Sequence, residues 1–301
     1  HVGALGKTFN LNLAKCIRVT DVSALGEVCK LNLSECCFLP ADNVSCLKNV
    51  RYLDLSRCAL VSDVSALGRV YELNLSHCYR VVDVSALGGV HTLNLTACHY
   101  ITDVSALGVV YDLNLNGCDK ITDVSALGNV NTLAIAGCRQ VTDVSALGRN
   151  HCLNITGCSN VVDVGTLGDV ETLNLTNCKH ISDVSALGKV RSLNLTGCNS
   201  VTSVSALGSV HELILSECRG IKDISALREV KVLHITYKIV TNIYIRHVSA
   251  FGSVVELDLS GCLAVQDVSS LGHVQRLTLS GCIRVCDVSS LGDVTSLNLT
   301  G

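Results

Sequence analysis

A short unit recurs along the whole chain at a nearly constant period, and it constrains the fold more than any other feature. The string Asp-Val-Ser-Ala-Leu-Gly or a close variant begins fifteen times in the sequence, for example at Asp63, Asp83 and Asp103. The step is longer in two places, from Asp21 to Asn43 and from Asp223 to His247. A repeat with a period of about 20 residues predicts an array of one small unit. We therefore expect residues 1–301 to form a single array, with irregular coils at 36–43 and 229–247.

Each unit carries the pattern of a short strand. Residues 70–78 read Val-x-x-Leu-x-Leu-x-x-Cys, and Leu73 and Leu75 alternate with Glu72, Asn74 and Ser76. Apolar residues at every second position predict a strand with one buried face. Because one coil cannot bury these residues alone, neighbouring coils must stack to make a continuous core.

The rest of the unit predicts a tight turn. The Asp63 carboxylate can accept hydrogen bonds from backbone N–H groups ahead of Ala66 and Leu67. Gly68 is expected to take a positive φ and turn the chain. So short a coil leaves no room for a full helix, and we expect a turn or a short 3₁₀ helix on the far side. The insertion at 37–42, which contains the one proline, is expected to be an ordinary loop.

These residues resemble the leucine-rich repeat superfamily over the whole chain. The resemblance implies a solenoid of the α/β horseshoe type, nearly all β, with a parallel sheet on the concave face and about 15 coils. The Cys-to-Asp steps at 118–123 and 178–183 resemble F-box receptors, and Thr-Asp-Val-Ser-Ala-Leu resembles internalin-type repeats. The amino-acid sequence of the repeat also resembles that of repeat proteins of amoeba-infecting giant DNA viruses. The coils are shorter than in F-box receptors and internalins, and neither an F-box nor a wall-anchoring segment is evident, so neither function is carried over.

Thirteen of the 18 cysteines share one register of the repeat. We expect a buried ladder in which each thiol packs as a small hydrophobe and donates weakly to a carbonyl group. Their parallel Cβ vectors do not favour disulfides. A reduced cytoplasmic protein follows, in the host cytoplasm or virion if the chain is viral. Cys282 and Cys286 lack a second ligand pair at zinc-finger spacing, so we expect neither metal nor cofactor.

Charge and motifs exclude several classes of function. The chain has 23 basic and 26 acidic residues, so it lacks the excess of positive charge that favours binding to nucleic acid or to an anionic membrane. It lacks an apolar run long enough for a membrane span. The sequence contains no phosphate-binding loop, and it repeats every candidate catalytic group instead of providing one distinctive site. We therefore expect a protein that is not an enzyme.

Candidate binding residues lie where the repeat varies. Large amphipathic side chains of the kind that interfaces prefer occur before the strands and in the insertion near residue 240. These candidates are Tyr52, Tyr71, His91, Tyr111, His151, Arg191, Tyr237 and Tyr244. For the strip before the strands the alternative is drift at exposed positions, and for the insertion it is a fusion scar between two arrays.

The predicted function is a non-catalytic scaffold that binds a partner protein through its concave sheet and the edge of that sheet. One alternative is a structural element, for example of a viral particle, that self-associates through uncapped ends. Another uses the rows of Asn and Ser or Thr on the strands to bind a glycan or ice. We favour a structural role for those rows, as a ladder of mutual side-chain hydrogen bonds along the sheet.

Overall fold

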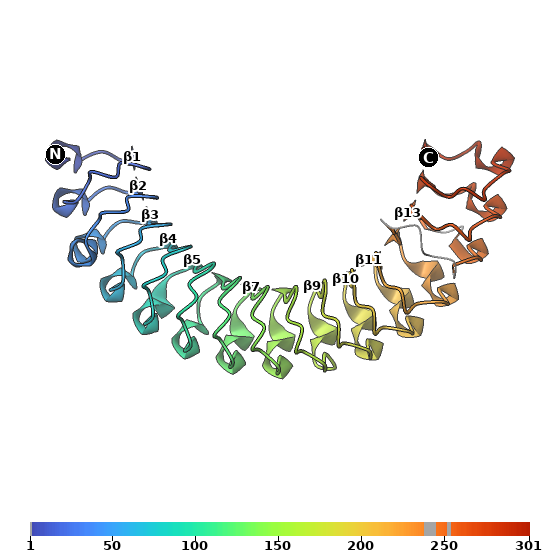
Figure 1. Cartoon of the computed structure of the whole chain (residues 1–301), viewed down its shortest axis with the longest axis horizontal. Helices are drawn as coiled ribbons and strands as arrows, with labels where there is room; N and C mark the ends of the chain where they lie inside the picture. Colours follow the sequence, from blue (N-terminus) through green and yellow to red (C-terminus); the bar gives the residue numbers. More distant parts are fainter. Residues whose placement is uncertain (1, 238–244, 252–253) are drawn as a thin grey trace. The chain divides into compact units, whose positions relative to one another are not determined.

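The structure is a computed structural model that describes residues 2–237, 245–251 and 254–301. Its contacts group into two compact units, His1–Asn154 and Ile155–Gly301, which we call unit 1 and unit 2. In each unit the strands line the inner, concave side and the 3₁₀ helices lie on the outer side (Figure 1). The single array over 1–301 stays a prediction.

Fifteen short strands occur in the described residues, and within each unit every strand pairs in parallel with the next. Unit 1 contains β1 (Asn10–Asn12), β2 (Lys30–Asn32), β3 (Tyr52–Asp54), β4 (Glu72–Asn74), β5 (Thr92–Asn94), β6 (Asp112–Asn114), β7 (Thr132–Ala134) and β8 (Cys152–Asn154). Unit 2 contains β9 (Thr172–Asn174), β10 (Ser192–Asn194), β11 (Glu212–Ile214), β12 (Val232–His234), β13 (Glu256–Asp258), β14 (Arg276–Thr278) and β15 (Ser296–Asn298).

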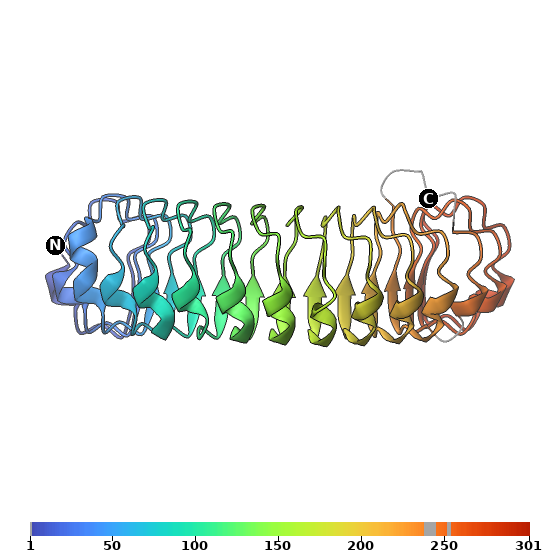
Figure 2. The same ribbon diagram turned by 90° about the horizontal axis from the view of Figure 1, so that it is seen from below.

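Every strand is preceded by a 3₁₀ helix, as the length of the repeat predicts, and Figure 2 shows these helices side by side along each unit. Unit 1 has η1 (Gly3–Leu5), η2 (Ser23–Leu25), η3 (Ala41–Leu47), η4 (Ser65–Leu67), η5 (Ser85–Gly89), η6 (Ser105–Leu107), η7 (Ser125–Asn129) and η8 (Ser145–Arg149). Unit 2 has η9 (Leu167–Asp169), η10 (Ser185–Lys189), η11 (Ser205–Ser209), η12 (Ser225–Glu229), η13 (Ser249–Phe251), η14 (Ser269–Leu271) and η15 (Ser289–Leu291).

The insertion in unit 1 differs from the expected loop. Pro40 directly precedes η3, which is longer than the other 3₁₀ helices of the described chain. Proline suits this place because its fixed φ fits a helix start and its missing N–H costs no bond there.

The core of each coil is aliphatic. In the coil of β4, Leu67, Val70, Leu73, Leu75 and Cys78 are at most 1% exposed. They pack against the same registers of the neighbouring coils. This confirms that stacked coils share one core within each unit.

The glycine of the repeat has a different role from the one predicted. Gly68 has φ −63° and ψ −5°, so the predicted positive φ is wrong. Close packing explains the residue instead: a methyl group built on Gly208, at the same register, would lie 2.5 Å from the Ala226 carbonyl oxygen of the next coil. The left-handed residue is the one before the ladder cysteine, for example His77 at φ 61° and Gly117 at φ 73°.

The aspartate of the repeat closes the turn as predicted. The Asp63 Oδ1 accepts a hydrogen bond of 2.9 Å from the Ser65 backbone N–H. Bonds from the Ser65 hydroxyl and backbone hold the pKa of Asp63 below its usual value. The same backbone contact recurs at Asp21, Asp83, Asp103, Asp123, Asp143, Asp183, Asp223, Asp267 and Asp287.

One buried amide interrupts the core. Asn150 is 1% exposed and occupies the register of Val130. Its Nδ2 donates to the carbonyl of Leu127 at 3.0 Å and to that of Val130, whereas its Oδ1 has no hydrogen-bond partner among the described residues. A buried acceptor without a partner costs about 1–3 kcal/mol.

The close approach at the glycine register predicts that Gly208→Ala is destabilising. Because the neighbouring backbone must move, we expect a loss of about 1–3 kcal/mol, measured as a lower urea midpoint. Gly292→Ala is the matched control, since no atom lies within 4 Å of a Cβ built there. Equal losses in the two variants would contradict the packing explanation.

The unpartnered oxygen predicts that Asn150→Val stabilises the protein by about 1 kcal/mol. The Leu127 carbonyl keeps its bond from the Val130 backbone N–H, and the Val130 carbonyl loses its amide donor, which valine also does not supply at this register of other coils. Urea unfolding checks this, with Val130→Asn as the reverse change that should destabilise. An unchanged or lower midpoint for Asn150→Val would contradict it.

Candidate functional site

The outward asparagines of the strands bind their own backbone. The Asn74 Oδ1 accepts a hydrogen bond from the Ser76 backbone N–H at 3.0 Å, which ends the strand. The same contact recurs at Asn12, Asn32, Asn94, Asn114, Asn174, Asn194 and Asn298. A bond across coils also occurs, from Asn74 Nδ2 to Asp54 Oδ2 at 3.2 Å. The row is therefore built mainly from local turns and not from the mutual ladder that we expected.

Three of the predicted binding residues form a continuous ring stack. The ring centroids of Tyr71 and His91 lie 4.6 Å apart with an interplanar angle of 18°. Those of His91 and Tyr111 lie 4.9 Å apart at 24°. Tyr52 meets Tyr71 edge-on at 6.0 Å. Neighbouring strands are spaced by about 4.8 Å, so rings at one register of successive coils fall at stacking distance.

Two cations extend the ring stack at its N-terminal end. The Arg51 guanidinium carbon lies 5.1 Å from the Tyr71 centroid and 5.6 Å from that of Tyr52. The Lys30 Nζ lies 4.8 Å from the Tyr52 centroid. Tyr71, His91 and Tyr111 therefore turn ring faces toward one another, and the Arg51 guanidinium lies beside Tyr71. Tyr71 and Tyr111 remain 39% and 49% exposed, which leaves ring edges and hydroxyl groups accessible.

The strand face beside the ring stack is hollowed and acidic. A shallow depression of about 330 Å³ is lined by residues of β4 to β7, including Glu72 and Asp112. A second depression of about 220 Å³ shares Glu72 and adds Asp54, Lys30 and Tyr52. In unit 1, carboxylates therefore line the two depressions, and the edges of the aromatic rings lie beside them.

His151, Arg191 and Tyr237 belong to coils beyond the ring stack, those of β8, β10 and β12. His151 and Arg191 are exposed at the same register, in unit 1 and unit 2 respectively. Tyr237 is only 7% exposed, and its hydroxyl donates to the Cys218 carbonyl at 3.2 Å. It therefore packs inside the coil and offers no surface ring. Tyr244 lies outside the described residues, as does most of the insertion that contains it.

Sequence reasoning missed a second group of rings on the loops that follow the strands. Tyr79 and His99 stack at 5.7 Å with an interplanar angle of 5°. The His99 Nδ1 lies 3.4 Å from Asp119 Oδ1, and the Lys120 Nζ lies 4.3 Å from the Tyr100 centroid. A comparison of the two positions after each ladder cysteine could have revealed this loop cluster.

The cysteine ladder is confirmed in both units. The Cys78 Sγ donates to the Leu55 carbonyl of the preceding coil at 3.1 Å. The same bond recurs at Cys36, Cys58, Cys98, Cys118, Cys138, Cys178, Cys198, Cys218, Cys262 and Cys282. All 18 cysteines are free thiols. Burial raises the pKa of Cys58 to about 12, so such a thiol is protonated and is a poor nucleophile.

Other chemistry finds little support in the described part of the chain. Across residues 2–237, 245–251 and 254–301, the side chains form no group of three or more His, Cys, Asp or Glu that could hold a metal ion. Among the same residues no helix has the length and apolarity to cross a bilayer.

Solved structures of similar shape decide the fold class. Internalin InlF of Listeria monocytogenes matches 93% of this chain and 83% of its own chain, with a TM-score of 0.58 and 20% identity. The chain has the leucine-rich repeat fold. A leucine-rich repeat protein of Leptospira interrogans matches 98% of this chain and 84% of its own, with a TM-score of 0.54 and 17% identity.

The functional domain of InlJ from Listeria monocytogenes, which includes a cysteine ladder, matches 98% of this chain and 63% of its own, with a TM-score of 0.54 and 18% identity. Neither a protein-family model nor a curated protein matches the sequence. The neighbours support the resemblance to leucine-rich repeats of the internalin kind as a matter of fold. The resemblances to F-box receptors and to giant-virus proteins stay predictions.

The buried ladder predicts selective thiol chemistry. In the native protein at pH 8, iodoacetamide should modify the exposed Cys16 and Cys286 and leave Cys58, Cys98 and Cys178 unmodified. Burial raises the pKa values of these three to about 12, 12 and 11. Peptide mass spectrometry checks this, with all 18 cysteines modified in urea as the control. Native labelling of Cys58 as fast as Cys16 would contradict it.

Proposed function

We propose that the chain is a non-catalytic scaffold that binds a partner protein through the strand face of unit 1 and the edge that carries the ring stack. The observation that carries this proposal is the stack of Tyr71, His91 and Tyr111. Tyrosine is enriched among the residues that contribute most to protein interfaces. The ring stack lies beside the hollowed strand face, so one partner can contact both.

Preorganisation supports a binding role for the ring stack. Immobilising a side chain on binding costs about 0.5–1.5 kcal/mol. Tyr71 is already held between Arg51 and His91, so much of that ordering precedes the encounter. The partner therefore meets ring edges and hydroxyl groups in fixed positions.

The carboxylates that line the two depressions support a partner with basic groups. Glu72 and Asp112 line the larger depression, and Asp54 lines the smaller one. Carboxylates beside aromatic edges complement lysine and arginine side chains. A glycan fits this surface less well, because the ring faces between Tyr71, His91 and Tyr111 cannot stack on a sugar and the oxygens of the asparagine row bind the backbone.

We also propose that the protein works in a reducing compartment such as the cytoplasm, and in the host cytoplasm or virion if it is viral. The 18 free thiols support this. Leucine-rich repeats carry many different recognitions, so the identity of the partner depends on experiment.

The test is a pull-down from cell lysate with quantitative mass spectrometry, followed by affinity measurement on the recovered protein. Replacing Tyr71, His91 and Tyr111 together with alanine should weaken binding at least tenfold, because interface hot spots contribute about 2 kcal/mol or more each. The matched control replaces Tyr79, His99 and Tyr100 of the loop cluster, which removes the same ring types elsewhere and should leave the affinity unchanged.

Two results would contradict the proposal. One is equal affinity in the wild type and the variant without the ring stack. The other is recovery of this chain alone, in oligomers that neither variant affects, which would support the self-associating structural element.

A further inference from the structure

The coil of β12 departs from the repeat at two positions. His234 occupies the register where the asparagines that close the strand-end turn stand elsewhere. The ladder register falls on residue 238, which is lysine and not cysteine in the sequence. This coil also belongs to the longer step that ends at His247. The ladder contact from the following coil is kept, since the Cys262 Sγ donates to the Ile235 carbonyl at 3.4 Å.

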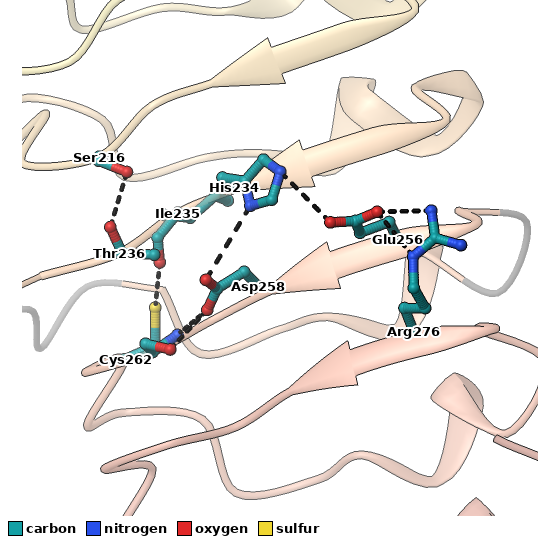
Figure 3. Close-up of polar contacts among 9 residues, drawn as sticks. Ser216, His234, Ile235, Thr236, Glu256, Asp258, Cys262 and Arg276 are labelled. Atoms are coloured by element: carbon teal, nitrogen blue, oxygen red, sulfur yellow. Dashed lines mark hydrogen bonds and ion pairs between the residues drawn. The ribbon is translucent and has the colours of Figure 1, made fainter. Parts of the chain in front are cut away.

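Substitute contacts on the strand face hold this coil (Figure 3). The Thr236 hydroxyl donates to the Ser216 Oγ at 2.7 Å, toward β11. Toward β13, the His234 Nε2 lies 3.7 Å from Glu256 Oε1 and its Nδ1 lies 3.9 Å from Asp258 Oδ2.

Each of these two carboxylates is held in place through its other oxygen, which accepts hydrogen bonds from a separate partner. Arg276 on β14 donates to the Glu256 Oε2 from Nε at 2.8 Å and from Nη2 at 2.6 Å. The Asp258 Oδ1 accepts from the backbone N–H of Ser260 at 2.9 Å and from its hydroxyl at 2.5 Å. Each carboxylate thus keeps its other oxygen directed at the imidazole (Figure 3).

We propose that protonation of His234 strengthens the pairing of β12 with β13, and that loss of this proton weakens the pairing of these two strands. The imidazolium can donate from both ring nitrogens, one toward each carboxylate, whereas a neutral ring has only one N–H. The clasp is the group His234, Glu256 and Asp258.

The charges that face His234 favour the protonated ring. Glu212 lies on β11, and Glu256 and Asp258 lie on β13, with the Arg276 guanidinium on β14 paired to Glu256. The adjacent Asp258 carboxylate raises the pKa of His234; burial opposes this, and the charges of Glu256 and Glu212 add to the rise. His234 is 26% exposed, so solvent screens the cluster in part.

The direction of the pH effect follows from the raised pKa. A histidine titrates near pH 6.5 in an unfolded chain. The clasp therefore contributes its full stabilisation below about pH 6.5 and loses it as the pH rises through the higher value of the folded state.

Two substitutions distinguish the effect of the charges in this cluster from the effect of side-chain shape. His234→Asn introduces the residue that this register carries in many coils, so the fold should persist. Asp258→Asn removes the charge and can keep the turn, because asparagine makes the same bond to the backbone two residues on, as Asn74 does. His211→Asn is the control, a histidine of β11's coil that is not among the groups that shift His234.

The first measurement is an NMR titration of the imidazole in the full chain. We expect the His234 signal to titrate above pH 6.5 and to move to lower pH in Asp258→Asn, while His211→Asn leaves it unchanged. A His234 titration at or below 6.5, or one that Asp258→Asn does not move, would overturn the proposal.

The second measurement is amide hydrogen exchange of residues 232–237 and 255–260 between pH 5.5 and 8.5. The exchange rate in His234→Asn is divided by the rate in the wild type at the same pH. This ratio removes the dependence of the intrinsic amide exchange rate on pH, which is the same in both proteins. We expect this ratio to be several-fold above one at pH 5.5 and to approach one at pH 8.5, since one pKa unit corresponds to a factor of ten. A ratio independent of pH would overturn the proposal.

Discussion

Stacking of one coil on the next is the constraint on which the rest of the structure depends. A single coil is too small to enclose its own valines and leucines, so it buries them only against its neighbours. Parallel strand pairing then fixes the distance between coils at about 4.8 Å. At that distance a methyl group at the Gly208 register meets a backbone carbonyl, and a thiol at the Cys78 register reaches the carbonyl of the preceding coil.

The same spacing turns repeated registers into ordered rows on the surface. Rings at one register of β4 to β6 stack because the coils lie at the distance that aromatic pairs prefer. The solenoid therefore orders side chains that would be mobile on an isolated loop. The proposed binding face therefore needs no pocket, since its rigidity comes from the fold and its chemistry from the residues at the variable positions.

The repeat also makes its exceptions informative. Asn150 in the core and His234 on the strand face each stand at a register where other coils carry one preferred residue. In both cases the structure shows what replaces the usual contact: two bonds from an amide nitrogen at Asn150, and carboxylates from the next strand at His234. Two positions of the same repeat thus differ from their equivalents in the contacts that they make.

The sequence by itself determined the solenoid class, the 3₁₀ turns, the Asp63-type turns and the buried cysteine ladder. A strand pattern repeated at so short a period can bury its apolar face in few other ways. Only the tertiary structure decided why Gly68 is glycine, that Tyr71 and His91 stack, that Tyr237 is buried, and that His234 lies between carboxylates. These properties depend on distances between coils, and residues that lie one coil or more apart in the sequence carry no record of how their side chains meet.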